Sequence, residues 1–493
     1  MEHTAGEAEG HSLQKNVLGM LDAVVMAVAG SAPAYSVAAT TAVIIGAVGL
    51  ASPAALLWCG IPMMGIAWAY SHLNRLEQNA GAAYAWTGRT LHPILGFTAG
   101  WAVVVSATIF MVAGSLPAGS VTLALFSNSA ANNVGWVTAV GSIWFLVMAG
   151  LVALGVRITA RAQWIMSSIE VGILFLFGIV ALVHASTHTH TAFSWSWFWF
   201  SHFHGFAGFA AGALVAAFYY WGWDVASNLN EETENSQVAS GIGGIIGVLI
   251  VFSLFEMYTV AVNMMLPAKT VQANSGDILS VLGNTIWSGP GGKILIIAVM
   301  LSTVATLETT LIQVTRTLFA MAREYTLPAP LGYIHRQWRT PAIATAVVAV
   351  VSLGLFIGSN YLGSLSTVLT DAISAIGLQI AIYYGLAGLT AAVAFRKHLL
   401  DSVSNFVLMG LWPLLGSAFM FWIFGKSIPS LGGTIDGVGL GAMGLGLIPL
   451  VWYWAKGSAY FKQRPTLGSV RVEDGPGGPR GVAVEAAEVT GSH

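Results

Sequence analysis

Twelve long apolar stretches recur along this chain, and they limit its fold more than any other feature. A helix needs about 20 mostly apolar residues to cross a bilayer, and most of the stretches reach that length. Because lipid offers no hydrogen bonds, backbone groups within such a stretch must be bonded internally, as they are in a helix. The stretches comprise residues 20–49, 54–72, 94–118, 134–154, 165–184, 208–228, 243–262, 294–318, 342–357, 365–394, 403–424 and 438–454. The sequence therefore predicts an all-α integral membrane protein with about 12 transmembrane helices.

The composition excludes a soluble protein. Hydrophobic residues make up 56% of the chain and charged residues only 8%, whereas soluble domains carry about 25% charged residues. So small a basic content offers no surface for nucleic acid, and the lipid bilayer is the expected partner. No nucleotide-binding loop is present, so the driving force for any transport should be an ion gradient or exchange. We expect neither enzymatic activity nor a cofactor. The single cysteine, Cys59, excludes an intramolecular disulfide.

The distribution of lysine and arginine predicts the orientation. With both termini in the cytoplasm, 16 of the 19 basic residues fall on that side, and only Lys269, Lys293 and Lys426 fall opposite. Basic loops stay in the cytoplasm, so this bias supports both the number of spans and the orientation. We expect a multi-pass protein of the cytoplasmic membrane, with a cytoplasmic tail over residues 1–18 and a transmembrane domain over 19–460. A second cytoplasmic tail, over 461–493, has the composition of a disordered segment.

Two of the predicted spans, the first and the sixth, are interrupted. The first contains "AGSAPA", residues 29–34, in which Pro33 removes a helix donor and disfavours a helical conformation in the residue before it. The sixth contains Gly222 within "YYWGWDVASN", residues 219–228. Two spans broken by glycine or proline in corresponding halves of a chain are typical of transporters built from inverted repeats, whose binding site lies between the breaks.

An acidic residue and four aromatic residues flank the second break. A charge at the bilayer centre costs about 2.5–3.5 kcal/mol, so Asp224 is expected to have a function. The neighbouring rings either enclose a cationic amine by cation–π attraction or serve in helix packing and the aromatic belt. These rings belong to Tyr219, Tyr220, Trp221 and Trp223.

Four stretches of this chain, in order, are similar to those of a known transporter family. They are "LNRLEQNAGAAYAWTGRTLHPILGFTAGW" (73–101), "ALGVRITARAQ" (153–163), "WGWDVASNLNEETEN" (221–235) and "QVTRTLFAMAREYTLPAPLGYIHRQWRTPAIA" (313–344). Together they resemble the amino acid–polyamine–organocation permeases over most of residues 17–397. The resemblance implies the LeuT-like fold, in which spans one to five and six to ten form 5+5 inverted repeats, followed by two further helices.

The resemblance also implies a substrate site at the two breaks. In amino acid permeases, the open backbone of span one seats the substrate carboxylate, and carbonyl groups at both breaks receive the ammonium group. This chain departs from the frequent Gly-Ser-Gly pattern with Gly30-Ser31-Ala32-Pro33, which leaves fewer free N–H groups and favours an amine or a modified amino acid. The matching positions are Ala29, Gly30, Ser31, Ala32 and Tyr35 in span one and Tyr220, Trp221, Gly222, Trp223 and Asp224 in span six.

A second departure concerns ion coupling. Many relatives have a lysine in span five that substitutes for a bound cation, whereas this chain has Glu170 at that position. Burial favours the neutral form of a carboxyl group, and the central parts of spans one, five and six contain no basic residue. We therefore expect Glu170 and Asp224 to exchange protons, in preference to sodium binding. Ser302 and Thr303 in span eight are candidate ion-coupling residues or simple interhelical hydrogen-bond donors.

Glu308 in span eight has the same standing as Asp224, and Ser302, Thr303 and Thr306 are its hydroxyl neighbours at helical spacing. Glu256 and Asp371 also fall within predicted spans, but no motif assigns them a function. Five histidines follow span five, but they lack cysteine or acidic companions nearby, so we expect no metal site. These histidines are His184, His188, His190, His202 and His204.

The leading interpretation is a secondary transporter that moves an amino acid or small amine by alternating access. Three alternatives stay open: an inorganic cation carrier on the same fold, a metal-dependent membrane enzyme, and a nutrient sensor that does not transport.

Overall fold

Helices form most of the chain in the computed structural model, which describes residues 12–274, 277–359, 365–428, 436–463, 473–474 and 482–483. The long helices of the first half are α2 (Met20–Gly30), α3 (Pro33–Val48), α4 (Ser52–Leu76), α5 (Ala83–Thr90), α6 (Pro93–Ala124), α8 (Val134–Leu154) and α9 (Val156–Thr187). The shorter elements between them are η1 (Gly49–Ala51), α7 (Asn128–Ala131), η2 (Trp195–Phe198) and η3 (Phe200–His202).

The rest of the chain continues in the same way. Its longer helices are α10 (Gly205–Tyr219), α12 (Ser236–Met265), α14 (Ile278–Ile286), α15 (Pro290–Arg323), α16 (Ala342–Ser359), α17 (Leu365–Ala394), α19 (Trp412–Ser427) and α22 (Leu447–Ala455). Short helical pieces are α11 (Val225–Asn228), η4 (Asn230–Glu232), α13 (Ala268–Ala273), η5 (Ala329–Gly332), α18 (Val403–Asn405), η6 (Phe406–Leu411), η8 (Asp436–Leu440), α21 (Gly441–Leu445) and α23 (Ala459–Lys462). Two short strands, β1 (Glu473–Asp474) and β2 (Val482–Ala483), pair antiparallel.

The predicted transmembrane helices are present. In the described part of the chain, ten helical stretches are long and apolar enough to cross a bilayer. One of them, Met20–Leu76, contains the first two predicted spans because η1 joins α3 to α4 without a loop. The sixth span is missing from the ten because its break shortens α10 to Gly205–Tyr219. The protein is therefore an all-helical, multi-pass membrane protein.

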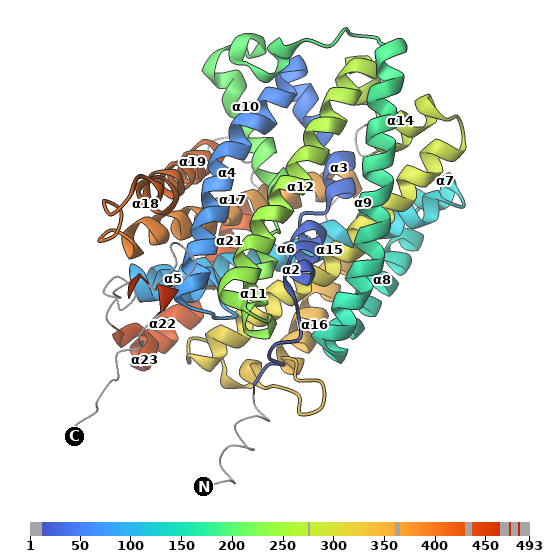
Figure 1. Cartoon of the computed structure of the whole chain (residues 1–493). Helices are drawn as coiled ribbons and strands as arrows, with labels where there is room; N and C mark the ends of the chain where they lie inside the picture. The colour runs from blue at the N-terminus through green and yellow to red at the C-terminus, as the bar shows by residue number, and fades with distance from the viewer. Residues whose placement is uncertain are drawn as a thin grey trace, which may run out of the picture.

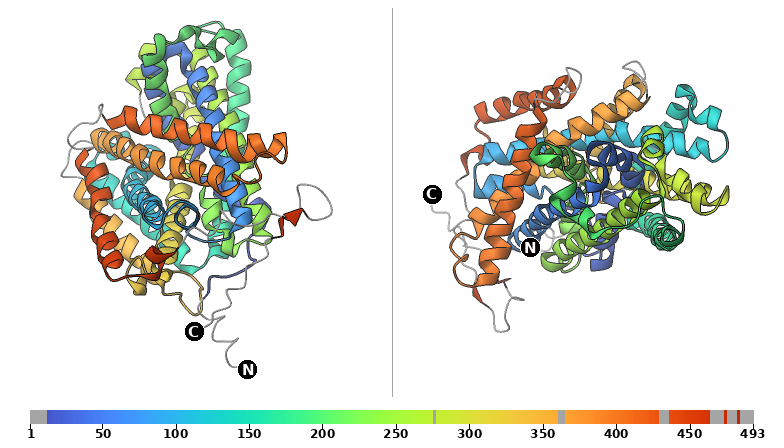
Figure 2. Two further views of the ribbon diagram at one scale, coloured as in Figure 1. Left: turned by 90° about the vertical axis from the view of Figure 1, so that its left-hand side faces the viewer. Right: turned by 90° about the horizontal axis from the view of Figure 1, so that it is seen from above.

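The helices cross at two main inclinations. α4, α9 and α12 run along the vertical direction of Figure 1. α17 and α19 lie side by side and cross these helices steeply, as the left view of Figure 2 shows. α15 passes through the middle of the bundle, in contact with α6, α9 and α2. The segment before α2 and the helix α23 lie at the lower end in Figure 1. We call this the basic end, because Arg157 lies at the start of α9, Arg323 at the end of α15 and Lys462 at the end of α23.

Small residues bring the helices close together. A Cβ atom on Gly119 of α6 would lie 2.2 Å from the carbonyl oxygen of Val137, and one on Gly141 of α8 would lie 2.4 Å from that of Ser115. Membrane helices often pack backbone against backbone through such residues, since lipid gives little hydrophobic drive between helices. Gly155, with a φ of 128°, is the single residue between α8 and α9 and lets the chain reverse there.

The two chain ends are described only in part. The structure does not describe most of the predicted disordered tail over 461–493, nor residues 1–11 of the predicted tail over 1–18.

The segment before α2 is hydrogen-bonded to the end of the sixth span. The N–H groups of Val17 and Leu18 donate to the carbonyl oxygen of Glu232 at 2.9 and 3.2 Å, and the N–H of Glu234 donates to that of Leu18 at 2.7 Å.

Candidate functional site

The two interrupted spans touch at their breaks. α2 ends at Gly30 and α3 begins at Pro33, while residues 220–224 separate α10 from α11. A Cβ atom on Gly30 would lie 2.1 Å from the carbonyl oxygen of Gly222, and one on Gly222 would lie 2.1 Å from that of Gly30. Glycine at both positions therefore allows the main chains to meet. Figure 1 shows the α2–α3 junction in the middle of the bundle, beside α12 and α15.

The structure places the predicted substrate residues at this meeting point. All ten are buried: Ala29, Gly30, Ser31, Ala32, Tyr35, Tyr220, Trp221, Gly222, Trp223 and Asp224. Ala32 adopts the left-handed conformation, with φ 48° and ψ 59°. That conformation favours glycine, the residue that the resembling family often has here.

The N-terminus of α3 already has a side-chain acid as its partner. The N–H of Ala34 donates to Oε1 of Glu170 at 3.0 Å, and the N–H of Tyr35 donates to Oγ of Ser302 at 3.2 Å. Pro33 has no N–H group, and the N–H of Ser36 donates to the carbonyl oxygen of Ala32 at 2.7 Å. A helix N-terminus attracts negative charge because its first N–H groups lack helical partners. Here the carboxyl group of Glu170 and the hydroxyl of Ser302 occupy that position.

Hydroxyl groups of α15 contact the first break at two points. Ser302 reaches Tyr35, and Oγ1 of Thr306 donates to the carbonyl oxygen of Ala29 at 2.7 Å. The hydroxyl of Thr303, in contrast, donates to Val299 within α15, at 2.7 Å. The structure thus brings Ser302 to the break together with Thr306, which was not among the predicted ion-coupling residues. Thr306 lies one helical turn after Ser302, and in the sequence it stands out only as a hydroxyl neighbour of Glu308.

Asp224 is held by neutral donors from two other helices. Its Oδ1 accepts a hydrogen bond from the hydroxyl of Tyr384 on α17 at 2.8 Å, and its Oδ2 accepts one from Nε2 of Gln313 on α15 at 2.7 Å. The side chain is 1% exposed, and the described residues give it no ion pair. Gln313 lies eleven residues beyond Ser302 on α15, or about 16 Å along the helix. Glu170 and Asp224 therefore belong to two separate polar clusters.

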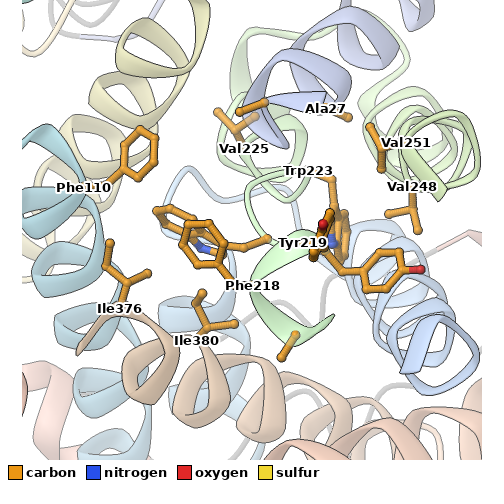
Figure 3. Packing of buried hydrophobic residues seen from close by; sticks show 14 of the residues in the cluster. Ala27, Phe110, Phe218, Tyr219, Trp223, Val225, Val248, Val251, Ile376 and Ile380 are labelled. Atoms are coloured by element: carbon orange, nitrogen blue, oxygen red, sulfur yellow. The ribbon is translucent and has the colours of Figure 1, made fainter. Parts of the chain in front are cut away.

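The side chains of the four aromatic residues in the sixth span point to different neighbouring helices. Tyr219 and Tyr220 bond to Thr41 and Leu56 through their hydroxyl groups, both at 2.9 Å. Trp221 donates to the hydroxyl of Tyr383 at 2.6 Å, and Trp223 stacks on the ring of Tyr384 with a centroid separation of 5.6 Å. In Figure 3, Phe218 points toward Phe110, Ile376 and Ile380, whereas Tyr219 and Trp223 lie on the side of Val248 and Val251. The four rings therefore do not form one wall.

Two hydrogen-bonding groups near Asp224 remain unused. Tyr70 packs edge-on against Trp223 at 5.1 Å and against Tyr384 at 5.9 Å between ring centroids. Within the described part of the chain, neither the hydroxyl of Tyr70 nor Nε1 of Trp223 has a hydrogen-bond partner. An acid, an amide and four aromatic rings, two of which carry an unused polar group, thus meet beside the second break: Asp224, Gln313, Tyr70, Trp223, Tyr383 and Tyr384. We call this set the Asp224 cluster.

Acidic residues after α11 pair with arginines at the end of α15. Glu232 accepts hydrogen bonds from Nε and Nη2 of Arg316 at 3.0 and 3.1 Å, and the two side chains are at most 1% exposed. Glu231 pairs with Arg323 at 2.7 Å. These pairs join the end of the sixth span to α15.

The histidines of the segment after α9 do not gather into one cluster. The rings of His184 and His188 stack at 4.4 Å, and His202 shares a hydrogen bond of 2.8 Å with Ser196. Among the described residues, no group of three or more His, Cys, Asp or Glu side chains is placed to hold a metal ion.

Comparison with known proteins covers nearly the whole chain. A family model for amino acid permeases matches residues 18–454, in agreement with the resemblance found in the sequence. A branched-chain amino acid permease of Lactococcus lactis is 24% identical over 375 residues, which cover 72% of this chain and 78% of that protein. A low-affinity putrescine importer of Escherichia coli is 24% identical over 61% of this chain and 66% of its own length. A methylthioribose transporter of Bacillus subtilis is 22% identical over 59% of this chain, and the match spans 63% of its length, less than two thirds.

Proposed function

Since the chain belongs to the amino acid permease family, we propose that it is a proton-coupled secondary transporter of a small cationic amine, working by alternating access. The observation that carries this proposal is the carboxylate of Glu170 on the N-terminus of α3, beside the touching breaks. It bears on both the substrate and the coupling ion.

The substrate class follows from the anion that the protein itself supplies. A substrate carboxylate would need the free N–H groups at the start of α3, but Ala34 and Tyr35 donate to Glu170 and Ser302. A second anion beside Glu170 would also be repelled by it. A cationic nitrogen meets no such obstacle, and the Asp224 cluster offers it a carboxylate and aromatic faces. Named relatives include an importer of putrescine, a diamine. Amino acids remain the second choice.

Proton coupling follows from the bonds of Glu170. One of its oxygens holds Ala34, and the other, Oε2, has no hydrogen-bond partner among the described residues. Protonation would remove the negative charge that favours the α3 N-terminus and weaken the link between span five and span one. Proton binding at Glu170 would thus loosen the broken span against its scaffold. A bound ion can shift two conformations only through such a difference in contacts.

The proposed location is the cytoplasmic membrane, with the basic end facing the cytoplasm. The excess of lysine and arginine at that end supports this orientation. Uptake would then begin from the opposite side, where α10 starts, and substrate would leave past the ion pairs of Glu231 and Glu232.

Uptake into liposomes tests this proposal. We expect amines to raise the thermal stability of the purified protein, as ligands of the folded state do, and an imposed pH gradient to drive their accumulation. The Glu170→Gln variant should bind amines but lose gradient-driven accumulation, because its side chain cannot exchange a proton. Accumulation that follows a sodium gradient and ignores pH would refute proton coupling and make Glu170 a candidate sodium ligand. Stabilisation by anions or sugars alone would refute the substrate class.

A further inference from the structure

A buried row of polar side chains leads from Glu170 toward the basic end of the bundle. Gln163, Ser167 and Glu170 are spaced by four and three residues on α9, so they share one face of that helix. All three are at most 3% exposed, within a helix whose other face is exposed. From Glu170 to Gln163 the row covers seven residues, or about 10 Å.

A second membrane acid joins this row from α15. Glu308 is 0% exposed, and its Oε2 accepts a hydrogen bond from Nε2 of Gln163 at 2.6 Å. The same Nε2 atom donates to the carbonyl oxygen of Ala305 at 2.8 Å. Gln163 is thereby fixed between α9 and α15, and it orients the carboxyl group of Glu308.

Each member of the row has one unused polar atom. Across the described ranges, no hydrogen-bond partner is found for Oε1 of Gln163, Oγ of Ser167, Oε2 of Glu170 or Oε1 of Glu308. A buried polar atom left unpaired costs about 1–3 kcal/mol. Four of them along one interface between two helices are therefore expensive, and a mobile ion or proton would compensate for them.

No basic group neutralises these acids. The described ion pairs include neither Glu170 nor Glu308. Of the helices against α15, α6, α8 and α16 contain no titratable side chain. Arg157 and Arg161 of α9 are exposed, away from the row. Packed helices bring other titratable groups to this region: Asp22 of α2, Tyr35 of α3, Asp224 beside α11, and Glu256 and Tyr258 of α12. Arg316 follows Glu308 by eight residues on α15, but it is paired with Glu232.

We propose that Glu308 is a second proton-binding residue and that the row conducts the proton between Glu170 and the basic end. In the described conformation the hydroxyl of Ser167 bonds to neither acid, so the transfer requires the two carboxyl side chains to turn toward it. Protonated Glu170 then gives its proton to Ser167, which passes its own hydrogen to the carboxylate of Glu308. The balance is one proton moved: Glu170 ends as a carboxylate, Glu308 as a carboxylic acid, and Ser167 is unchanged. A hydroxyl suits this step because it both donates and accepts. Gln163 acts as a positioning residue. The inference rests on the proposed proton coupling at Glu170.

Proton movement in liposomes tests the route, with a pH-sensitive dye trapped in the lumen. Substrate counterflow without a gradient is measured on the same samples, because exchange needs folding and binding but no net proton transfer. We expect Glu308→Gln to slow substrate-coupled proton movement about tenfold or more, in line with the loss of a proton-transferring side chain, and to leave counterflow nearly unchanged. Glu308→Asp, which retains a carboxyl group, should recover part of the rate.

Ser167→Ala should slow proton movement in the same way. Ser352→Ala is its matched control, because Ser352 is also a buried hydroxyl without a partner in the described residues but lies on α16, away from the row. If Glu308→Gln moves protons at the wild-type rate, the route is wrong while the proposed function stands. If the wild type itself moves no protons with substrate, the proposed coupling and the route both fail.

Discussion

At the scale of single residues, the two acids of the site form hydrogen bonds with different parts of the protein. Glu170 bonds to the start of α3, and Asp224 bonds to Tyr384 and Gln313. The position of Glu170 in span five was open to prediction, because the family resemblance marks it. The partners of Asp224 were not, since they lie 160 and 89 residues away in the sequence. Such partners depend on how helices pack, which hydropathy and motifs do not encode.

Ala32 carries a conformational cost that can be measured. Its φ of 48° places a side chain in the left-handed region, which costs about 1–2 kcal/mol for a residue other than glycine. We expect Ala32→Gly to raise the free energy of unfolding in detergent by about 1 kcal/mol, and to improve uptake of α-amino acids relative to amines. Ala34→Gly, within helical backbone, should instead lower stability by about 1 kcal/mol. Equal effects of both variants would show that the conformation of Ala32 carries no strain.

At the scale of elements, the sequence predicted which helices exist better than where they end. The twelve apolar stretches correspond to helices, and the two breaks lie where Pro33 and Gly222 indicated. α15, however, runs over Pro290–Arg323, beyond the predicted 294–318. The added residues at its end, Phe319 to Ala322, are buried against other parts of the protein. Hydropathy measures contact with lipid, so it does not detect a helix that continues inside the protein.

The contact between the two broken spans predicts intolerance of any side chain. Alanine at Gly30 or Gly222 would put a Cβ atom 2.1 Å from a carbonyl oxygen of the other span, so the breaks would have to separate. We expect Gly30→Ala and Gly222→Ala to abolish amine binding, measured by ligand-induced thermal stabilisation. Gly46→Ala is the matched control in α3, where a Cβ atom would meet nothing within 4 Å. It should retain binding and gain about 0.5–1 kcal/mol of stability. Normal binding by both break variants would contradict a site at this contact.

At the scale of the whole molecule, the basic end is closed by linked contacts. The segment before α2 pairs with residues 232–234, and Glu232 is bonded to Arg316. The beginning of span one, the end of span six and α15 are thus joined at one place. The positive-inside pattern predicted the charge of this end. It did not predict this closure, which requires acids and arginines to meet across three elements.

Removing the acid of the buried pair should loosen this end. Glu232→Gln leaves the guanidinium of Arg316 buried without its anion, which costs about 3–5 kcal/mol in comparable pairs. We expect lower thermal stability and faster labelling of a cysteine introduced at Ala80, whose carbonyl oxygen accepts a hydrogen bond from Asn228 near the pair. The native Cys59 is buried and should contribute little background. Glu324→Gln, at a more exposed pair with Arg89, is the control. Unchanged labelling in Glu232→Gln would show that the pair does not hold this end closed.

The resident carboxylate at the start of α3 also has an electrical consequence. If each cycle carries one cationic amine and one proton on Glu170, two positive charges cross the bilayer together. Each charge moved through 100 mV is worth about 2.3 kcal/mol, so an interior-negative voltage of that size would add about 4.6 kcal/mol to the drive for uptake. A neutral substrate on the same protein would gain only half of it. The membrane voltage would then favour charged over uncharged cargo, independently of how tightly either one binds.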